Sequence, residues 1–424
     1  MHRSGESGFK PGAFLRCVYQ LHRSMFSVYN IDSLPMDVFH SIDPLDIILY
    51  NKLMNAWRLC EQSNEDESIS PAENAQDILD SICEKFEAGE GGVEELVPND
   101  VSFSLVIHAW CKSNRPDAPE RAEKLLRRKE EFAEKFSNIR ILPSDYTPVI
   151  SKWRDDPAKG AERATLLFED VLSRYGNSEE VQSRPTAATL NALLDVYAKW
   201  HERNLADSAE LCLERMKRSH DEGRGCILPD VVSYRSVIDA WVRSWDRDSP
   251  RRVDALVNEM IRLHADEGRD DLRPDINAFN LILKACSTAP AMWGGMKDDV
   301  DGHPIAIANR TFATLKGKNQ YGATATHATY SFMFNTYRQH MHFRDKRYPT
   351  LMGSLWRHCC RDGLASQFSL DSFRLSVLEL DFWRAIGGRS DKFDRLNAED
   401  VTLKDLPAEW SKNVTPMKRP KRYE

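Results

Sequence analysis

Two short clusters of histidine and cysteine are the residues of this sequence best suited to metal chemistry. They are His340-Met341-His342 and His358-Cys359-Cys360. Imidazole and thiolate groups bind zinc, but a site needs further ligands at suitable spacing, and neither cluster has a partner pair. The nine cysteines are otherwise scattered, without a C-x-x-C pair. We therefore interpret both clusters as ordinary helix residues and expect no metal.

The sequence lacks the common motifs of enzymes. The sequence contains no G-x-x-x-x-G-K-[ST], G-x-G-x-x-G, H-E-x-x-H or G-x-S-x-G. No motif therefore indicates a kinase, NTPase or hydrolase. We expect a protein that is not an enzyme, needs no cofactor and takes no small-molecule substrate. No apolar run reaches the roughly 20 residues that span a bilayer, so no membrane is expected as a partner. The net charge of -7 counts against a surface coated in basic residues.

A recurring eight-residue phrase indicates the elements of the fold. Each copy begins with an aromatic residue or leucine, has apolar residues three to four places on, and usually has Trp or Tyr seven places on, which is the spacing of a buried helix face. The central copies are 43 to 45 residues apart, counted from their first residues. The seven copies are YNKLMNAW from Tyr50, FSLVIHAW from Phe103, YTPVISKW from Tyr146, LNALLDVY from Leu190, YRSVIDAW from Tyr234, FNLILKAC from Phe279 and YSFMFNTY from Tyr330.

Two further phrases accompany the first one. A small residue followed by a larger one at i+4 recurs after six of the copies and predicts a second helix packed closely on the first. It is seen at Ala75, Ala122, Ala164, Ala209, Val253 and Ala308. Before five of the copies, proline and a helix-capping residue end the preceding segment. These breakers are Pro98-Asn99, Pro143-Ser144, Pro185-Thr186, Pro229-Asp230 and Pro274-Asp275.

The stretch PDVVSYRSVIDAWVRS (Pro229 to Ser244), followed by RRVDALVNEMIRL and RPDINAFNLILKAC, closely resembles the pentatricopeptide repeat family. The resemblance covers roughly residues 46–365 and implies an all-α fold, an α-solenoid of about seven helix-turn-helix repeats in a right-handed superhelix. The tetratricopeptide family is the nearest rival, but it favours W-x-x-L-G-x-x-Y in its first helix. Here large apolar residues occupy the place of that glycine. A tetratricopeptide-like protein-binding scaffold stays open as the alternative, and the net negative charge is its best argument.

The resemblance implies a reader of single-stranded RNA in which each repeat addresses one base through two or three side chains. Two of these side chains form the pair that recognises the base. One directly follows the aromatic residue of the first helix, and the other is the last residue of the repeat. By the family pattern, Asn191 with Asp230 reads uridine and Asn51 with Asn99 reads a pyrimidine. Ser104 has no clear partner. The remaining pairs are Thr147 with Thr186, Arg235 with Asp275, and Asn280 with Thr326.

Two more columns of residues fit the same interpretation. The resemblance implies that the second residue of each repeat packs against the bases, where apolar side chains make contacts independent of sequence. This column contains Ile48, Val101, Ala188, Val232, Asn277 and Ala328. Two places beyond the first-helix Trp or Tyr, a basic residue recurs as Lys112, Lys199 and Arg243 and predicts a stripe that contacts phosphates.

The two ends of the chain complete the predicted organisation. Residues 1–45 form an N-terminal segment, interpreted as a presequence or a partial repeat, and residues 366–424 form a C-terminal helical and basic tail. The first 31 residues hold one acid, Glu6, against Arg3, Lys10, Arg16 and Arg23, which faintly resembles an organelle presequence. The family resemblance implies the mitochondrion, with the plastid as the alternative. It also implies a role in organellar RNA processing, stability or translation, with a transcript and a processing or translation factor as partners.

Overall fold

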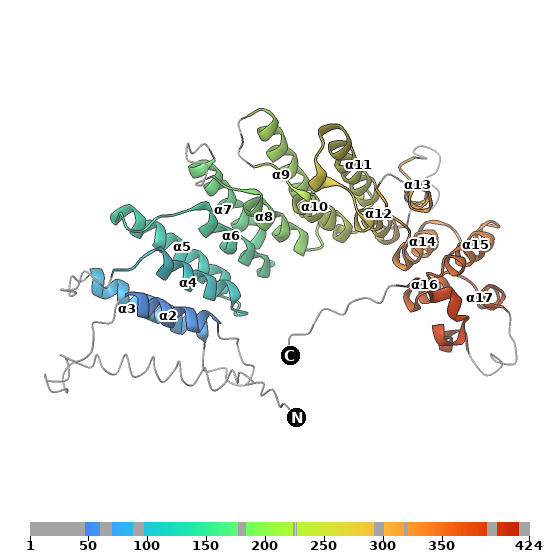
Figure 1. Cartoon of the computed structure of the whole chain (residues 1–424), viewed down its shortest axis with the longest axis horizontal. Coiled ribbons are helices and arrows are strands. Elements are labelled where there is room, and N and C mark those ends of the chain that lie inside the picture. Colours follow the sequence, from blue (N-terminus) through green and yellow to red (C-terminus); the bar gives the residue numbers. More distant parts are fainter. Residues whose placement is uncertain are drawn as a thin grey trace, which may run out of the picture. The chain divides into compact units, whose positions relative to one another are not determined.

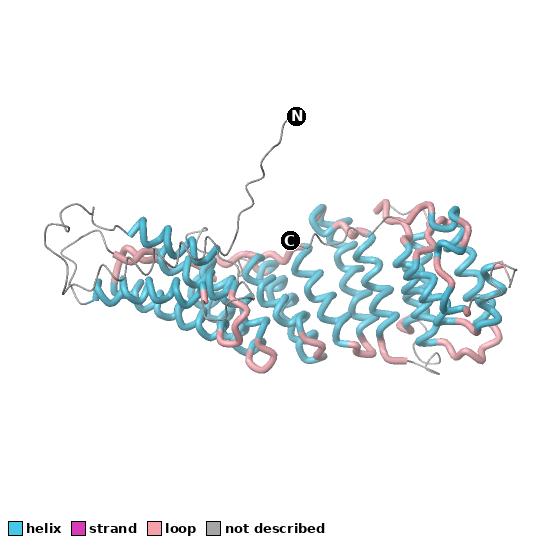
Figure 2. Tube along the Cα trace, turned by 90° about the horizontal axis from the view of Figure 1, so that it is seen from below, coloured by secondary structure: helices cyan, strands magenta, loops and turns pink. Residues whose placement is uncertain are grey.

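The computed structural model describes residues 47–59, 70–87, 97–176, 184–223, 225, 227–291, 301–317, 321–387 and 397–414. These residues form consecutive pairs of α-helices, and Figures 1 and 2 show only helices and loops among them. The predicted all-α fold of helix-turn-helix repeats is confirmed, and stacked pairs of this kind define an α-solenoid. Along the chain, the first helix of each repeat is followed by its second helix in the order α2 (Ile47–Leu59) and α3 (Pro71–Glu87), α4 (Asp100–Lys112) and α5 (Ala118–Lys135), α6 (Pro143–Lys152) and α7 (Gly160–Tyr175), α8 (Ala187–Lys199) and α9 (Arg203–Asp221), α10 (Val231–Ser244) and α11 (Ser249–Glu267), α12 (Ile276–Thr288) and α13 (Pro304–Lys316), α14 (His327–His340) and α15 (Tyr348–Arg361), and α16 (Gln367–Ser376) and α17 (Glu379–Ile386).

The first helices of neighbouring repeats pack on one another, and the aromatic residues of the recurring phrase are buried in the core. Helix α4 packs between α2 and α6, and α12 packs between α10 and α14. Burial of these large rings supplies much of the hydrophobic stabilisation of each repeat. At most 4% of the surface is exposed in Tyr50, Trp57, Phe103, Trp110, Tyr146, Trp153, Tyr234, Trp241, Phe279 and Tyr330.

The second helices approach the first ones through the predicted small residues. Ala75, Ala122, Ala164 and Ala209 are completely buried, and so is Val253. A small side chain at this place lets two helix backbones come close, while the larger residue one turn later fills the space between them. The small-then-large phrase therefore acts as predicted.

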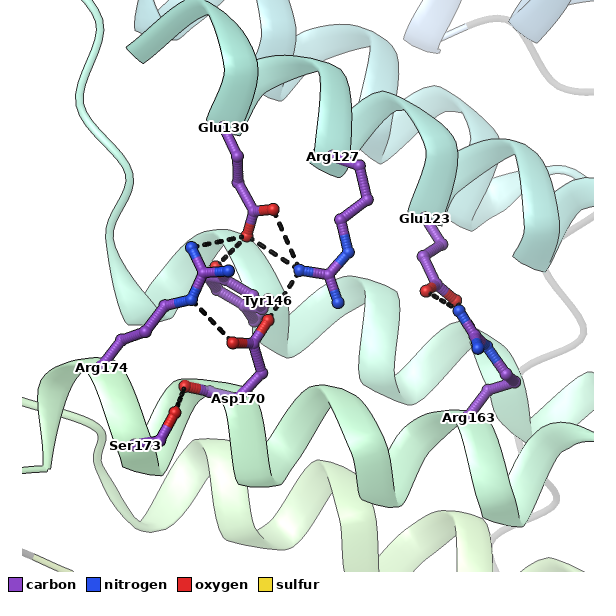
Figure 3. A network of polar contacts seen from close by, with 8 residues as sticks. All are labelled: Glu123, Arg127, Glu130, Tyr146, Arg163, Asp170, Ser173 and Arg174. Atoms are coloured by element: carbon purple, nitrogen blue, oxygen red, sulfur yellow. Dashed lines mark hydrogen bonds and ion pairs between the residues drawn. The ribbon is translucent and has the colours of Figure 1, made fainter. Parts of the chain in front are cut away.

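A network of charged groups joins two neighbouring second helices, α5 and α7, in Figure 3. Arg127 of α5 binds Glu130 of its own helix at 2.9 Å and Asp170 of α7 at 2.6 Å. Arg174 reaches the same Asp170 at 2.6 Å, and the hydroxyl of the first-helix Tyr146 donates to Glu130. Several charges sharing partners in this way are a stronger link than an isolated surface ion pair. Successive repeats are thus connected by polar as well as apolar contacts.

The last described residues, 397–414, pack against the C-terminal helix pairs. Helix α16 begins with the same kind of cap as the earlier first helices, Ser366 with Ser369, and it packs on α14. Residues 397–414 then return to the repeats, where Trp410 accepts a backbone hydrogen bond from Ala365 at 2.8 Å and its ring lies against Trp356. The pattern of first and second helices thus runs on past residue 365.

The chain divides into two compact units. The first comprises residues 1–196 and 219–227, and the second comprises residues 197–218 and 228–424. The predicted right-handed superhelix concerns the whole array of repeats and stays a prediction. The N-terminal segment, residues 1–45, and the basic end of the tail, residues 415–424, lie outside the described residues.

Candidate nucleic-acid interface

The start of each first helix holds the residues that were predicted to read bases. Asn99, Asp230, Asp275 and Thr326 are the N-caps of α4, α10, α12 and α14, and the side chain of each accepts a hydrogen bond from the backbone N–H three residues on. A cap oxygen satisfies a helix N–H that has no partner within the helix. The predicted last residue of each of these repeats therefore has a structural role as well.

Asn51 and Asn99 lie together, as the predicted pair requires. The Asn51 amide nitrogen donates to Asn99 Oδ1 at 3.3 Å, across the junction between α2 and α4. A third residue joins them, because the Ser102 hydroxyl donates to Asn51 Oδ1 at 2.8 Å and accepts from the Asn99 backbone N–H at 3.3 Å. Asn51 and Asn99 are thus two of the three residues in a closed hydrogen-bond network at the start of α4.

Asn280 and Thr326 repeat this arrangement between α12 and α14. The Asn280 amide nitrogen donates to Thr326 Oγ1 at 3.4 Å, and the Thr329 hydroxyl donates to Asn280 Oδ1 at 2.8 Å. Thr329 also accepts from the backbone N–H of Thr326 at 2.9 Å. Two repeats that are far apart in the chain therefore hold an asparagine amide in the same way.

The junction between α4 and α6 differs from the prediction. Helix α6 begins at Pro143 with Leu142 at the cap position, so Ser144 lies inside the helix and does not cap it. Asp145 takes over the capping by accepting from the Leu142 backbone N–H at 2.9 Å. The partner of Ser104 that the sequence left open is this Asp145, whose Oδ1 accepts from the Ser104 hydroxyl at 3.4 Å.

The other predicted pairs have different surroundings. Thr147 contacts the hydroxyl of Thr189 at 3.1 Å, while Thr186 is exposed at the start of α8. Arg235 is exposed on α10 and makes no ion pair with another described residue. Asp275 accepts from the side chain of Asn277 at 2.7 Å. Asn191 and Asp230 belong to different compact units, so their pairing stays a prediction.

The large apolar members of the predicted base-packing column are exposed. Ile48 keeps 57% of its surface exposed, Val101 53% and Val232 49%. Branched apolar side chains at the start of a helix, directly beside capping groups, do not contribute to the core. They are available to pack against a flat ring.

Two hollows are lined by residues from the predicted columns. One of about 630 Å³ in the first unit is bounded by Thr147, Thr186, Ala188 and Asn191, with Arg184 also at its edge. The other, of about 740 Å³ in the second unit, is bounded by Asn277, Asn280, Thr326 and Ala328. In both, a polar pair and a member of the base-packing column face the same space, a combination suited to a flat polar ligand.

The predicted basic column lies in the last turns of first helices. Lys112 ends α4 and Arg243 lies one residue before the end of α10, and both side chains are exposed. Lys199 is half-buried at the end of α8, with its ammonium 5.9 Å from the ring centre of Trp200. Each charge occupies the same place in its own repeat, as predicted, although the first unit holds Lys112 and the second unit the other two.

The histidine and cysteine clusters have no feature of a metal site in the structure. Among the described residues no group of three potential metal ligands is found. His340 is buried, and its Nε2 donates to the carbonyl oxygen of Cys286 at 2.8 Å. Burial raises the pKa of Cys359 to about 12, so this thiol stays protonated at neutral pH. No helix in the described part of the chain is long and apolar enough to cross a membrane.

Buried His340 should make stability depend on pH. Burial lowers its pKa from 6.5 to about 4, so between these values the unfolded chain binds a proton that the folded chain does not. The free energy of unfolding should therefore be highest above pH 6.5 and fall by about 3 kcal/mol as the pH drops to 4. Urea unfolding of wild type and His340→Gln across this range measures it, with His342→Gln, at an exposed position, as the control. An equal slope in wild type and His340→Gln would contradict this assignment.

Sequence reasoning missed the third residue from each cap. Ser102, Asp145, Thr189 and Thr329 contact the residue predicted to read a base in the preceding first helix. A signal was present, because a residue with a side-chain oxygen recurs three places after most of the cap positions, which is the spacing of a reciprocal cap.

Comparison with known proteins finds a solved helical-repeat structure among those similar to this chain. No protein-family model matches the chain, and no curated protein matches it. The crystal structure of the pentatricopeptide repeat protein PPR10 from maize is similar over 84% of this chain, with 19% identity and a TM-score of 0.39. This chain covers 44% of the length of the maize protein.

Proposed function

We propose that this chain binds single-stranded RNA with sequence selectivity, as a pentatricopeptide-type repeat protein that has no catalysis of its own. The observation that supports this most directly is the lining of the two hollows. In each, short polar side chains lie beside a member of the base-packing column, and residues from separate repeats supply both. Single-stranded RNA presents unstacked bases whose faces pack on side chains and whose edges form hydrogen bonds. The exposed cations at the ends of first helices fit the phosphates between such bases.

Titration of the purified full chain with random single-stranded RNA at two salt concentrations tests the proposal. We expect a Kd in the micromolar range or below. For each contacted phosphate, the logarithm of the affinity should fall by about 0.7 when the salt concentration rises tenfold. Double-stranded RNA of the same length is the control and should bind more weakly, because its bases are stacked inside the duplex. Absence of binding at low salt would contradict the proposal and favour a protein-binding scaffold.

An organellar role in transcript processing, stability or translation belongs to the same proposal. Its support is the composition of residues 1–31, with four basic residues against one acid, together with the resemblance of the repeats. A fluorescent fusion of the full chain should accumulate in mitochondria or plastids. A fusion that stays in the cytosol would remove this part of the proposal and leave RNA binding to its own test.

A further inference from the structure

The contact between the third residue of a first helix and the preceding first helix recurs at four junctions. Ser102 reaches Asn51, Asp145 reaches Ser104, Thr189 reaches Thr147, and Thr329 reaches Asn280. The two residues in contact are 51, 41, 42 and 49 positions apart in the sequence. The contact thus persists although the repeats differ in length, so it is a property of how first helices stack.

We propose that this third residue, which we call the orienting residue, decides which hydrogen-bonding groups the reading residue presents to a base. The inference rests on the proposed function, because it concerns the same RNA-binding face. The orienting residue itself stays away from the RNA, since Ser102 and Thr329 have no exposed surface. It is therefore a positioning residue.

The two asparagines show how such orientation works. An asparagine amide has an acceptor and a donor end of nearly equal shape, and rotation by half a turn exchanges them. Ser102 donates to Asn51 Oδ1, while Asn51 Nδ2 donates to Asn99 Oδ1. A turned amide would bring two carbonyl oxygens together, because Asn99 Oδ1 is itself held by the backbone N–H of Ser102 at 3.1 Å. One hydrogen of Asn51 Nδ2 and one lone pair of Asn51 Oδ1 remain for a base, and the positions of this donor and this acceptor are fixed.

Other junctions hold different residue types at the same two places. The carboxylate of Asp145 can only accept, so it holds the Ser104 hydroxyl as a donor and leaves that oxygen as an acceptor for a base amino or imino group. Ala278 has the orienting place after Arg235 and lacks a polar side chain. A guanidinium is a donor in every orientation and needs no partner to choose its polarity. At these two junctions the type of orienting residue matches what the reading residue requires.

Selection from a random single-stranded RNA library, followed by sequencing, tests the proposal with full-length variants. Thr329→Val removes the hydroxyl and keeps the side-chain shape, and we expect the base preference at one position of the selected motif to fall about fivefold, the scale of one hydrogen bond. Ser102→Ala should weaken the preference at a different position, because it acts in another repeat. Thr329→Ser keeps a hydroxyl and should restore the wild-type motif.

A matched control separates orientation from helix capping. Ser369 of α16 accepts from the Ser366 backbone N–H at 2.7 Å, as Thr329 does from Thr326. Its hydroxyl donates to the Ser366 carbonyl and not to the preceding first helix. Ser369→Ala should therefore lose a comparable cap and leave the motif unchanged.

Three outcomes would overturn the proposal. The first is a wild-type motif retained by both Thr329→Val and Ser102→Ala, each folded as judged by circular dichroism. The second is a change in Ser369→Ala equal to that in Thr329→Val. The third is wild-type binding without base preference. Failure of the wild type to bind RNA at all is a distinct result, because it overturns the proposed function itself.

Discussion

Reversal of the basic column, Lys112→Glu, Lys199→Glu and Arg243→Glu together, should weaken binding of single-stranded RNA about 100-fold at about 0.1 M salt. Each of the three lost phosphate contacts contributes about 0.7 logarithmic units of affinity per decade of salt below about 1 M. The loss should be similar for every RNA sequence, because phosphates carry no base identity. The salt dependence should also become flatter, by about 2 logarithmic units of Kd per decade of salt. Fluorescence anisotropy titrations across a salt series measure both quantities.

A variant with the same change in net charge on second helices is the control. Lys124 and Lys135 of α5 and Arg357 of α15 are exposed, and none of them belongs to the predicted columns. Replacement of these three by glutamate alters the overall field of the protein equally, which separates a local effect from the general repulsion of RNA. If the two triple variants weaken binding equally, the basic column has no special role.

Asp145→Asn should destabilise the first unit by about 3 kcal/mol, because it leaves a buried ammonium without its counterion. Lys129 of α5 is buried, with 2% of its side chain exposed, and its Nζ lies 2.9 Å from Asp145 Oδ1. Asp100 is a poorer substitute at 3.9 Å and is itself 45% exposed. Urea unfolding followed by circular dichroism measures the loss.

A double variant distinguishes the buried charge from the loss of the cap. Lys129→Met combined with Asp145→Asn removes the ammonium, and we expect most of the stability to return, since a buried ion pair is often replaceable by apolar groups. Glu120→Gln is the control, because its ion pair with Lys159 is more than half exposed and should contribute little to the free energy of unfolding. If the double variant is no more stable than Asp145→Asn, the loss of stability comes from the missing cap and not from the buried charge.

The repeats themselves could be predicted from the sequence because the information is local. The spacing of Phe103, Val106 and Trp110 places one apolar face along α4, and Ala122 with Leu126 does the same for α5. A helix that cannot bury its face alone has to pack on a neighbour, so the stacking follows from the pattern. The caps at Asn99, Asp230 and Asp275 were equally visible, since each lies directly after a proline.

The start of α6 is where local reasoning was wrong. Pro143-Ser144 has the same form as the other breakers, but Pro143 occupies the first helical position, which a proline without an N–H suits well. That shift leaves Leu142 at the cap and gives the capping to Asp145. The buried Lys129 lies beside this carboxylate, and no pattern within one segment of sequence reveals such a neighbour.

The sequence by itself therefore determined the repeat, the helix faces and the columns of polar and basic residues, because each depends on neighbours within one helix or one turn. Only the tertiary structure decided which side chains meet across a junction. Ser102 reaches Asn51 and Thr329 reaches Asn280 over spacers of different length. These contacts lie at the N-terminal ends of the first helices, so the extra residues lie elsewhere in the repeat and do not alter them. Distance along the chain is no guide to such contacts, since packing of the first helices sets them.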